Sequence, residues 1–154
     1  GREIEDMPPM VRDRHMTVRV QNHLVRDVTQ VTAAAKLGDR EIVDARAPAQ
    51  FKGDAPEPRE GLRSGHIPGS RNVFFKTLLN DDATMKSPEE IRAVFQAAGV
   101  DLSKPVITTC GSGVTAAVLS LALEHAGKPD HSLYDGSWSE WGAFPTLPIA
   151  TGDA

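Results

Sequence analysis

The chain has 154 residues and a formal net charge of −4 at pH 7, with 40% hydrophobic and 25% charged residues. This size and composition indicate one globular domain with enough apolar residues for a core, and the negative charge argues against a nucleic-acid partner. No apolar run reaches the ~20 residues that a membrane-spanning helix needs, and the first residues lack the apolar core of a signal peptide.

Cys110 is the only cysteine, so the chain has no internal disulfide and no multi-cysteine metal site. The five histidines are not spaced like metal ligands, either with one another or with Cys110. We therefore expect no metal and no cofactor. A single thiol of this kind fits a reducing, cytoplasmic setting.

The first 16 residues are charged, contain Pro8-Pro9 and show no periodicity. This composition is typical of a tail or an interdomain linker, so we place a linker or tail at residues 1–16 and the folded domain at residues 17–154. Alternating polar and apolar residues at 17–20 predict a short edge strand.

The next part of the chain alternates short apolar runs with helical patterns, bounded by capping or turn residues. In chain order we expect a helix between Asp27 and Gly38, a buried strand at 41–44, a helical turn at 48–51, a strand at 71–74 and a helical segment at 76–79. Residues 52–65 form a polar stretch without periodicity, and loops of that length are often functional.

Two further helices flank the centre of the chain. Ser87-Pro88-Glu89-Glu90 is a capping box with proline at the first helical position, and it predicts a helix that Gly99 ends. A β-branched strand at 106–109 then leads into Cys110, a Gly-Ser-Gly loop and an apolar helix at 114–126. We expect this helix to be buried on most sides because its polar stripe is narrow.

The last quarter of the chain continues the alternation. A strand is expected at 132–134, and Ser137-Trp138-Ser139-Glu140 has the pattern of a second capping box that opens a short helix. The final residues, with Pro145 and Pro148, are expected to form a tail. Strands that alternate with helices indicate an α/β fold with a central parallel sheet and helices on both faces.

Several polar residues directly follow the predicted strands. Ligands of parallel sheets bind beyond the carboxyl ends of the strands, so we expect Cys110, the stretch 44–46 and Asp135 to share one rim. At Cys110 the loop N–H groups and the helix N-terminus both favour a thiolate over a thiol.

Other interpretations of Cys110 start from the same residues. A lone cysteine is often a small buried hydrophobe. The loop could also bind phosphate, but a phosphate-binding loop of the P-loop type needs Lys and Ser/Thr after its last glycine, where this chain has Val114-Thr115. A cysteine-dependent phosphatase needs an arginine at the position of Ala116. The order of strand, loop and helix favours Cys110 as a nucleophile over these interpretations.

The loop Cys110-Gly111-Ser112-Gly113-Val114-Thr115-Ala116 resembles the active-site loop of the rhodanese superfamily, in the form found in 3-mercaptopyruvate sulfurtransferases. Four other stretches match this family in the same order: Asp44-Ala45-Arg46, Glu57-Pro58-Arg59, Gly65-His66-Ile67-Pro68-Gly69-Ser70 and Tyr134-Asp135-Gly136-Ser137-Trp138. The resemblance covers roughly residues 17–144. It is similar to the carboxyl-terminal, catalytic half of a two-domain sulfurtransferase, and it implies a rhodanese-like three-layer sandwich.

The resemblance implies that Cys110 takes the sulfur of 3-mercaptopyruvate as a persulfide and passes it to cyanide or to a thiol, such as thioredoxin. Ser112 would assist catalytically by handling protons, and Arg59 would bind the substrate carboxylate. The remaining residues implied to contact the substrate are Gly111, Gly113, Val114, Thr115 and Gln50. The amino-terminal half of the family's architecture, which would lend groups across the cleft, is expected as a missing partner.

One position departs from the family pattern. Family members usually have a second arginine where this chain has Gln50, and Arg63 and Arg46 are the candidates to replace it, although we expect Arg46 to pair with an acidic neighbour. Thiosulfate sulfurtransferases typically carry a basic residue where this chain has Gly111. A thiosulfate sulfurtransferase and a non-catalytic rhodanese-like module that binds a partner or senses oxidants therefore remain alternatives.

Other conspicuous residues are expected to be structural. His66 would hold a turn by hydrogen bonding, Asp44 and Asp135 would anchor loop N–H groups, and the two tryptophans would belong to the core. The stretch from Glu57 to Glu60 is expected to be a solvated loop.

Overall fold

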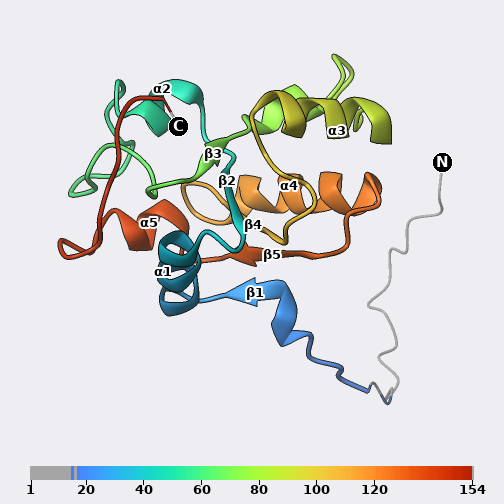
Figure 1. Ribbon diagram of the computed structural model, residues 1–154, viewed down its shortest axis with the longest axis horizontal. Helices are drawn as coiled ribbons and strands as arrows, with labels where there is room; N and C mark the ends of the chain where they lie inside the picture. The colour runs from blue at the N-terminus through green and yellow to red at the C-terminus, as the bar shows by residue number, and fades with distance from the viewer. Residues whose placement is uncertain (1–14, 16, 154) are drawn as a thin grey trace, which may run out of the picture.

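A five-stranded parallel sheet forms the centre of the protein (Figure 1). The computed structural model describes residues 15 and 17–153, so the linker or tail expected at residues 1–16 lies outside the described residues except for His15. Across the sheet the order is β1 (Val25–Arg26), β5 (His131–Tyr134), β4 (Val106–Thr109), β2 (Glu41–Asp44) and β3 (Arg71–Asn72). All four pairs are parallel, as the alternation of strands and helices predicts.

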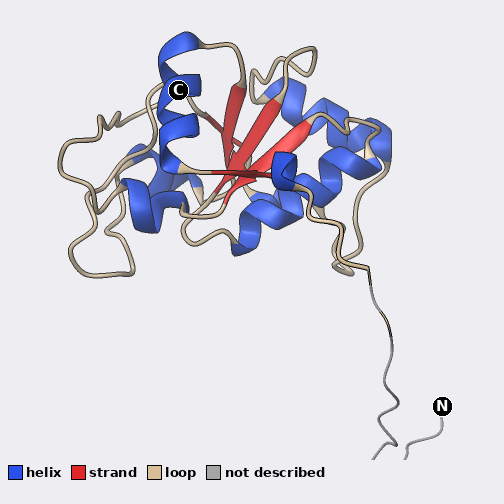
Figure 2. Cartoon of the chain, turned by 90° about the horizontal axis from the view of Figure 1, so that it is seen from below, coloured by secondary structure: helices blue, strands red, loops and turns tan. Residues whose placement is uncertain are grey.

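Helices cover both faces of this sheet, which confirms the predicted three layers (Figure 2). Neighbouring residues of a strand point to opposite faces. Val43 and Val106 accordingly pack in a cluster with α3 (Pro88–Ala97) and α4 (Val114–His125). Ile42 and Ile107 pack in a second cluster with α1 (Val28–Leu37) and α5 (Ser137–Trp141).

Capping residues begin and end the helices where the sequence indicates. Asp27 accepts a hydrogen bond from the Gln30 N–H at the start of α1, and Gly38 ends that helix in the left-handed conformation. Ser87 and Glu90 form the predicted capping box of α3. The turn expected at 48–51 is the helix α2 (Pro48–Lys52).

The first strand lies later in the chain than expected. The prediction of a strand at 17–20 is wrong: Val18 and Val20 are 73% and 74% exposed, and the edge strand β1 pairs Val25 with Leu133 of β5. Alternation alone fits any extended segment, whereas an edge strand needs a neighbour with free N–H and C=O groups. The strand expected at 71–74 shortens to β3, and the segment after it is a 3-10 helix, η2 (Phe75–Leu78).

Two expectations about the later helices also need correction. The helix α4 is not buried on most sides, because Val114 and Leu121 are 73% and 62% exposed. The capping box expected at Ser137 does not form, since Ser137 has a positive φ of 51° and no side-chain cap bond is made at the start of α5. Its hydroxyl serves the cysteine loop instead.

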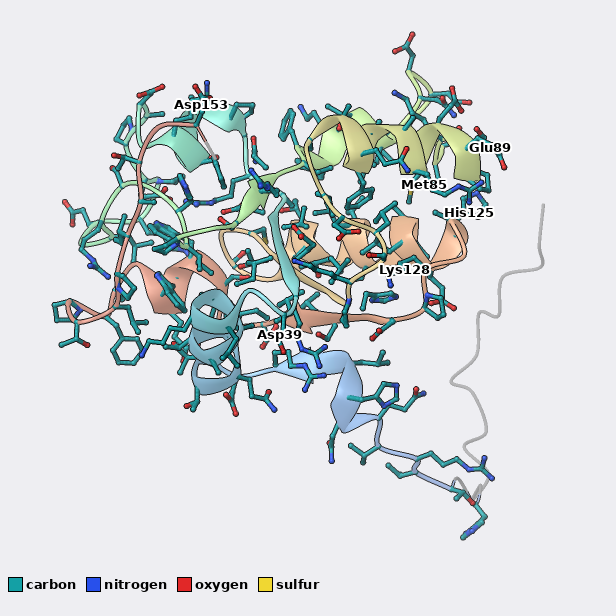
Figure 3. All side chains as sticks on the ribbon, viewed as in Figure 1. Asp39, Met85, Glu89, His125, Lys128 and Asp153 are labelled. Atoms are coloured by element: carbon teal, nitrogen blue, oxygen red, sulfur yellow. The ribbon has the colours of Figure 1, made fainter. Side chains whose placement is uncertain are left out.

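The last residues pack against the domain rather than forming a tail. Ala150 pairs with His66 in an isolated antiparallel bridge, and Leu147 and Ile149 pack against the α1 and α5 cluster. Asp153 forms an ion pair with Lys52 and lies beside α2 (Figure 3). Prolines limit regular secondary structure here, but they do not prevent tertiary packing.

The carboxyl ends of the parallel strands meet at one rim of the sheet. Asp44 lies opposite Thr109, and the N–H of Ala45 donates to the carbonyl of Thr109, so the stretch after β2 lies beside Cys110. The expected sharing of one rim is confirmed for these two segments. No helix among residues 15 and 17–153 has the length and apolar character needed to cross a membrane.

Two leucines of α4, one buried and one exposed, offer a direct test of the packing. Leu119 is fully buried between α4 and the sheet, so Leu119→Ala should lower the free energy of unfolding by about 2–5 kcal/mol through lost burial and a new cavity. Leu121→Ala, at an exposed position of the same helix, should change it by less than about 0.5 kcal/mol. Urea denaturation measures both, and equal losses would contradict the placement of α4.

Candidate active site

Cys110 lies where β4 ends and the loop to α4 begins. It is 2% exposed, and the N–H of Gly113 donates a hydrogen bond to its Sγ at 3.1 Å. Gly113 has a φ of 86°, and a Cβ at this position would lie 2.9 Å from a carboxylate oxygen of Asp135. Only glycine meets both conditions without strain, so the loop sequence places an N–H group against the sulfur.

The amino-terminal turn of α5 holds this loop from the other side. The carbonyl of Cys110 accepts from the Trp138 N–H at 2.9 Å, and the Ser137 hydroxyl accepts from the Cys110 N–H at 3.2 Å. The carbonyl of Gly111 accepts from both the N–H and the hydroxyl of Ser139, at 2.9 and 2.6 Å. These bonds fix the path of the backbone around the sulfur.

A cavity of about 280 Å³ opens at Cys110. Every predicted site residue except Gly113 lines it: Cys110, Gly111, Ser112, Val114, Thr115, Arg59 and Gln50. Gly113 contributes through its N–H to the sulfur. The structure therefore brings together residues from α2, from the long loop and from the cysteine loop.

The sulfur receives fewer hydrogen bonds than the sequence suggests. The loop sequence predicts several N–H groups around the thiolate, and within the described residues the hydrogen bond to Sγ comes from Gly113. Ser112 is exposed and lines the cavity, and Thr115 is half-buried beside it. Both hydroxyls are therefore available to a small molecule in the cavity.

Arg59 provides an available positive charge at the cavity. Its side chain is exposed, and its Nη1 donates to the hydroxyl of Ser139 at 2.6 Å. In the part of the chain that the structure describes, no carboxylate lies within ion-pair distance of it. Its guanidinium can thus bind an anion in the cavity.

Arg46, by contrast, is committed to the protein itself. It is 5% exposed, and its guanidinium binds the Asp44 carboxylate at 2.7 Å, the Glu57 carboxylate at 2.7 Å and the carbonyl of Gly65 at 2.7 Å. It also lies 4.4 Å from the centre of the Trp138 ring. The expected pairing with an acidic neighbour is confirmed, and two carboxylates neutralise this cation.

Arg63 does not replace the missing family arginine. Its guanidinium donates to the carbonyls of Trp141, Gly142, Phe144 and Leu147, which ties the long loop to the carboxyl-terminal segment. Neither arginine therefore replaces the family arginine, and neutral Gln50 occupies that position on the cavity wall. The expectation that Arg63 could replace the family arginine is therefore wrong. Sequence spacing does not reveal in which direction a long side chain points.

Glu57 is a residue whose role sequence reasoning missed. Its side chain is 3% exposed, so it is not part of a solvated loop as expected. Burial raises the pKa of Glu57 above its ordinary value, and the nearby charge of Asp44 adds to this, while Arg46 opposes both. The contact of Glu57 with the buried Arg46 would have indicated this role, but that contact is visible only in the folded structure.

His66, Asp44 and the two tryptophans take the structural roles expected of them, whereas Asp135 is exposed and, within the described residues, its carboxylate accepts no hydrogen bond from a loop N–H. His66 is 2% exposed, its Nδ1 lies 2.8 Å from the carbonyl of Phe51, and its ring stacks on the Phe51 ring. Trp138 and Trp141 are buried in the core. Within residues 15 and 17–153, no group of three or more His, Cys, Asp or Glu side chains is placed to hold a metal ion.

Comparison with known proteins adds to this geometry. Residues 28–144 match the family model of the rhodanese-like domain. The chain is 54% identical over 101 residues to the human 3-mercaptopyruvate sulfurtransferase, covering 66% of this chain and 34% of that protein. It is 43% identical over 142 residues to the thiosulfate sulfurtransferase of Rattus norvegicus, covering 92% of this chain and 48% of that protein.

A solved structure shares the fold at similar coverage. The crystal structure of SseA, a 3-mercaptopyruvate sulfotransferase from Escherichia coli, matches with a TM-score of 0.68 and 40% identity over 82% of this chain and 46% of that one. The chain thus spans between 34% and 48% of the length of these relatives.

The raised pKa of Glu57 predicts how stability changes with pH. An acid whose pKa is higher in the folded state contributes stability at low pH and loses it as the pH rises through the folded pKa. Glu57→Gln removes this titration and keeps an oxygen that accepts from Arg46. The free energy of unfolding of the variant, relative to the unaltered chain, should therefore rise as the pH increases above the ordinary glutamate pKa of about 4.3.

Denaturation at a series of pH values measures this difference. The lost ion pair with Arg46 sets the size of the stability difference, and the raised pKa of Glu57 sets how that difference changes with pH. Glu60→Gln, at an exposed position of the same loop, is the control for removing one carboxylate from this loop. A relative stability of Glu57→Gln that stays flat or falls with rising pH would contradict the prediction.

Proposed function

The chain belongs to the rhodanese-like domain family, and from this premise we propose that it is a sulfurtransferase. It would move sulfane sulfur from 3-mercaptopyruvate to a thiol or to cyanide, through a persulfide on Cys110. The observation that carries the proposal is the Cys110 sulfur at a small cavity, with a backbone N–H on the sulfur and an available guanidinium on the wall.

The first step is a displacement at sulfur. The Cys110 thiolate attacks the sulfur of 3-mercaptopyruvate, an S–S bond forms, and the C–S bond breaks with its electron pair passing to carbon as the enolate of pyruvate. A proton, taken from the substrate thiol, converts this enolate to pyruvate and leaves the persulfide anionic. The Gly113 N–H and the helix end behind it support that negative charge.

The second step returns the cysteine to its starting state. An acceptor thiolate, or cyanide, attacks the outer sulfur, and the S–S bond breaks with its electron pair returning to the Cys110 thiolate. A small thiol or thioredoxin would serve as the acceptor. A reducing compartment such as the cytoplasm would keep Cys110 available for each cycle.

Different residues of the cavity would bind different groups of the substrate. Arg59 would bind the carboxylate, and Ser112 would hydrogen-bond the keto oxygen and handle protons as the enolate forms. Gln50 and Thr115 would add neutral hydrogen bonds, and Gly111 and Val114 would shape the loop wall. Because the chain spans less than half of its relatives' length, a partner half that covers the cavity belongs to the proposal.

Thiosulfate is the second candidate donor, favoured by the similarity to a thiosulfate sulfurtransferase. The loop argues against it as the better donor: Gly111 supplies no cation beside the sulfur, and Arg46 is neutralised by its two carboxylates. A dianion would therefore meet one available arginine at the cavity wall, Arg59. A turnover rate with 3-mercaptopyruvate above that with thiosulfate is expected.

Intact-mass measurement tests the persulfide directly. Incubation with 3-mercaptopyruvate and no acceptor should add about 32 Da, the mass of one sulfur atom, and Cys110→Ser should gain nothing. Adding cyanide should remove the increment and release thiocyanate. Absence of the adduct in a preparation that also contains the partner half would overturn the proposal.

Charge at the cavity should control the affinity for the donor. Arg59→Gln removes a charge-assisted hydrogen bond and should lower kcat/KM for 3-mercaptopyruvate by about 10- to 100-fold. Gln50→Arg adds a cation to the same cavity and should lower KM. Arg19→Gln, at an exposed position outside the cavity, is the matched control, and equal effects of the Arg19 and Arg59 variants would contradict the assignment.

A further inference from the structure

A chain of hydrogen bonds joins the available arginine to the cysteine loop. The Nη1 of Arg59 donates to the hydroxyl of Ser139 at 2.6 Å, and that hydroxyl donates to the carbonyl of Gly111 at 2.6 Å. A hydroxyl has one hydrogen to donate and lone pairs to accept with, so both bonds form at once. Gly111 directly follows Cys110, so this series of hydrogen bonds ends one residue from the cysteine that carries the sulfur.

Ser139 itself is well fixed. It lies in α5 between Trp138, which is 1% exposed, and Glu140, which accepts from the hydroxyl of Tyr134. Its N–H donates to the same Gly111 carbonyl at 2.9 Å. The serine hydroxyl is therefore a rigid point at the edge of the cavity.

Arg59 has little else to fix it. It lies on the loop between α2 and β3, and within the described residues its exposed side chain makes one hydrogen bond, to Ser139. Glu57 anchors the loop two residues earlier through Arg46, but this contact does not orient the Arg59 guanidinium. The direction of the positive charge therefore depends on the Ser139 hydroxyl.

We propose that Ser139 is a positioning residue that holds the Arg59 guanidinium at a fixed place relative to the Cys110 sulfur, and so selects carboxylate-bearing donors. This inference rests on the proposed function and names what sets its selectivity. Ser139 acts through Arg59 and needs no contact with the substrate. Loss of its hydroxyl should weaken the binding of anions while leaving the thiol reactive.

Ser139→Ala separates this role from a structural one. The variant keeps the backbone N–H that donates to Gly111, so the cysteine loop retains that bond as well as the bond from Trp138. It loses both bonds of the hydroxyl, the one to the Gly111 carbonyl and the one from Arg59, and the Arg59→Gln background separates their effects. Ser139→Thr keeps a hydroxyl and should behave like the unaltered chain.

The probe is alkylation of Cys110 with two reagents of similar size and different charge. Iodoacetate carries a carboxylate and iodoacetamide is neutral, so the ratio of their rates measures the pull of Arg59 on an anion near the sulfur. Ser139→Ala should lower this ratio about three- to tenfold, the size expected for one hydrogen bond. Arg59→Gln should lower it at least as much, and Ser139→Ala should add nothing in that background.

Each result decides the matter. A ratio unchanged in Ser139→Ala but lowered in Arg59→Gln would overturn the positioning role, as would a ratio that Ser139→Thr fails to restore or one that neither variant changes. Steady-state kinetics should agree, with KM for 3-mercaptopyruvate raised in Ser139→Ala and kcat nearly unchanged. Because alkylation needs no sulfur transfer, failure of the proposed function would appear as a missing persulfide and not as an unchanged ratio.

Discussion

The hydrogen bond from the Gly113 N–H to the Cys110 sulfur is the contact around which this end of the molecule is arranged. It requires a parallel strand that ends at the cysteine, a glycine with positive φ, and a helix that starts immediately afterwards. Asp135, at the end of the neighbouring strand, leaves no room for a side chain at position 113. The strand, the loop and the helix therefore place a backbone N–H against the sulfur, where it can stabilise negative charge.

The two arginines at the cavity have separate tasks because their surroundings differ. Arg46 is buried between two carboxylates and an aromatic ring, so it joins β2, the long loop and α5. The two carboxylates neutralise its charge. Arg59, held by Ser139, keeps its charge available to an incoming anion. A loop that is anchored by one arginine and presents another can be long without losing the geometry of the site.

Local patterns predicted most of the fold, and the family resemblance indicated the residues that line the cavity. The capping residues Asp27 and Ser87, the strand at 41–44 and the loop after Cys110 each follow from a few neighbouring residues. The position of β1, the burial of Glu57 and the packing of residues 145–153 depend on partners far along the chain, which short-range patterns do not contain. Ser137 shows the same limit: its capping motif is overridden because its hydroxyl binds the Cys110 N–H and the Tyr134 carbonyl.

A crystal structure of the persulfide state tests the central claim, that the cysteine loop and the helix end stabilise the negative charge of the Cys110 persulfide through backbone N–H groups. Crystals of the chain exposed to 3-mercaptopyruvate without an acceptor should show a second sulfur on Cys110, within hydrogen-bond distance of loop N–H groups, with the Arg59 guanidinium still on Ser139 or on the released carboxylate. An outer sulfur that lies against the guanidinium of Arg59 or Arg46 and makes no contact with the loop N–H groups would contradict the account.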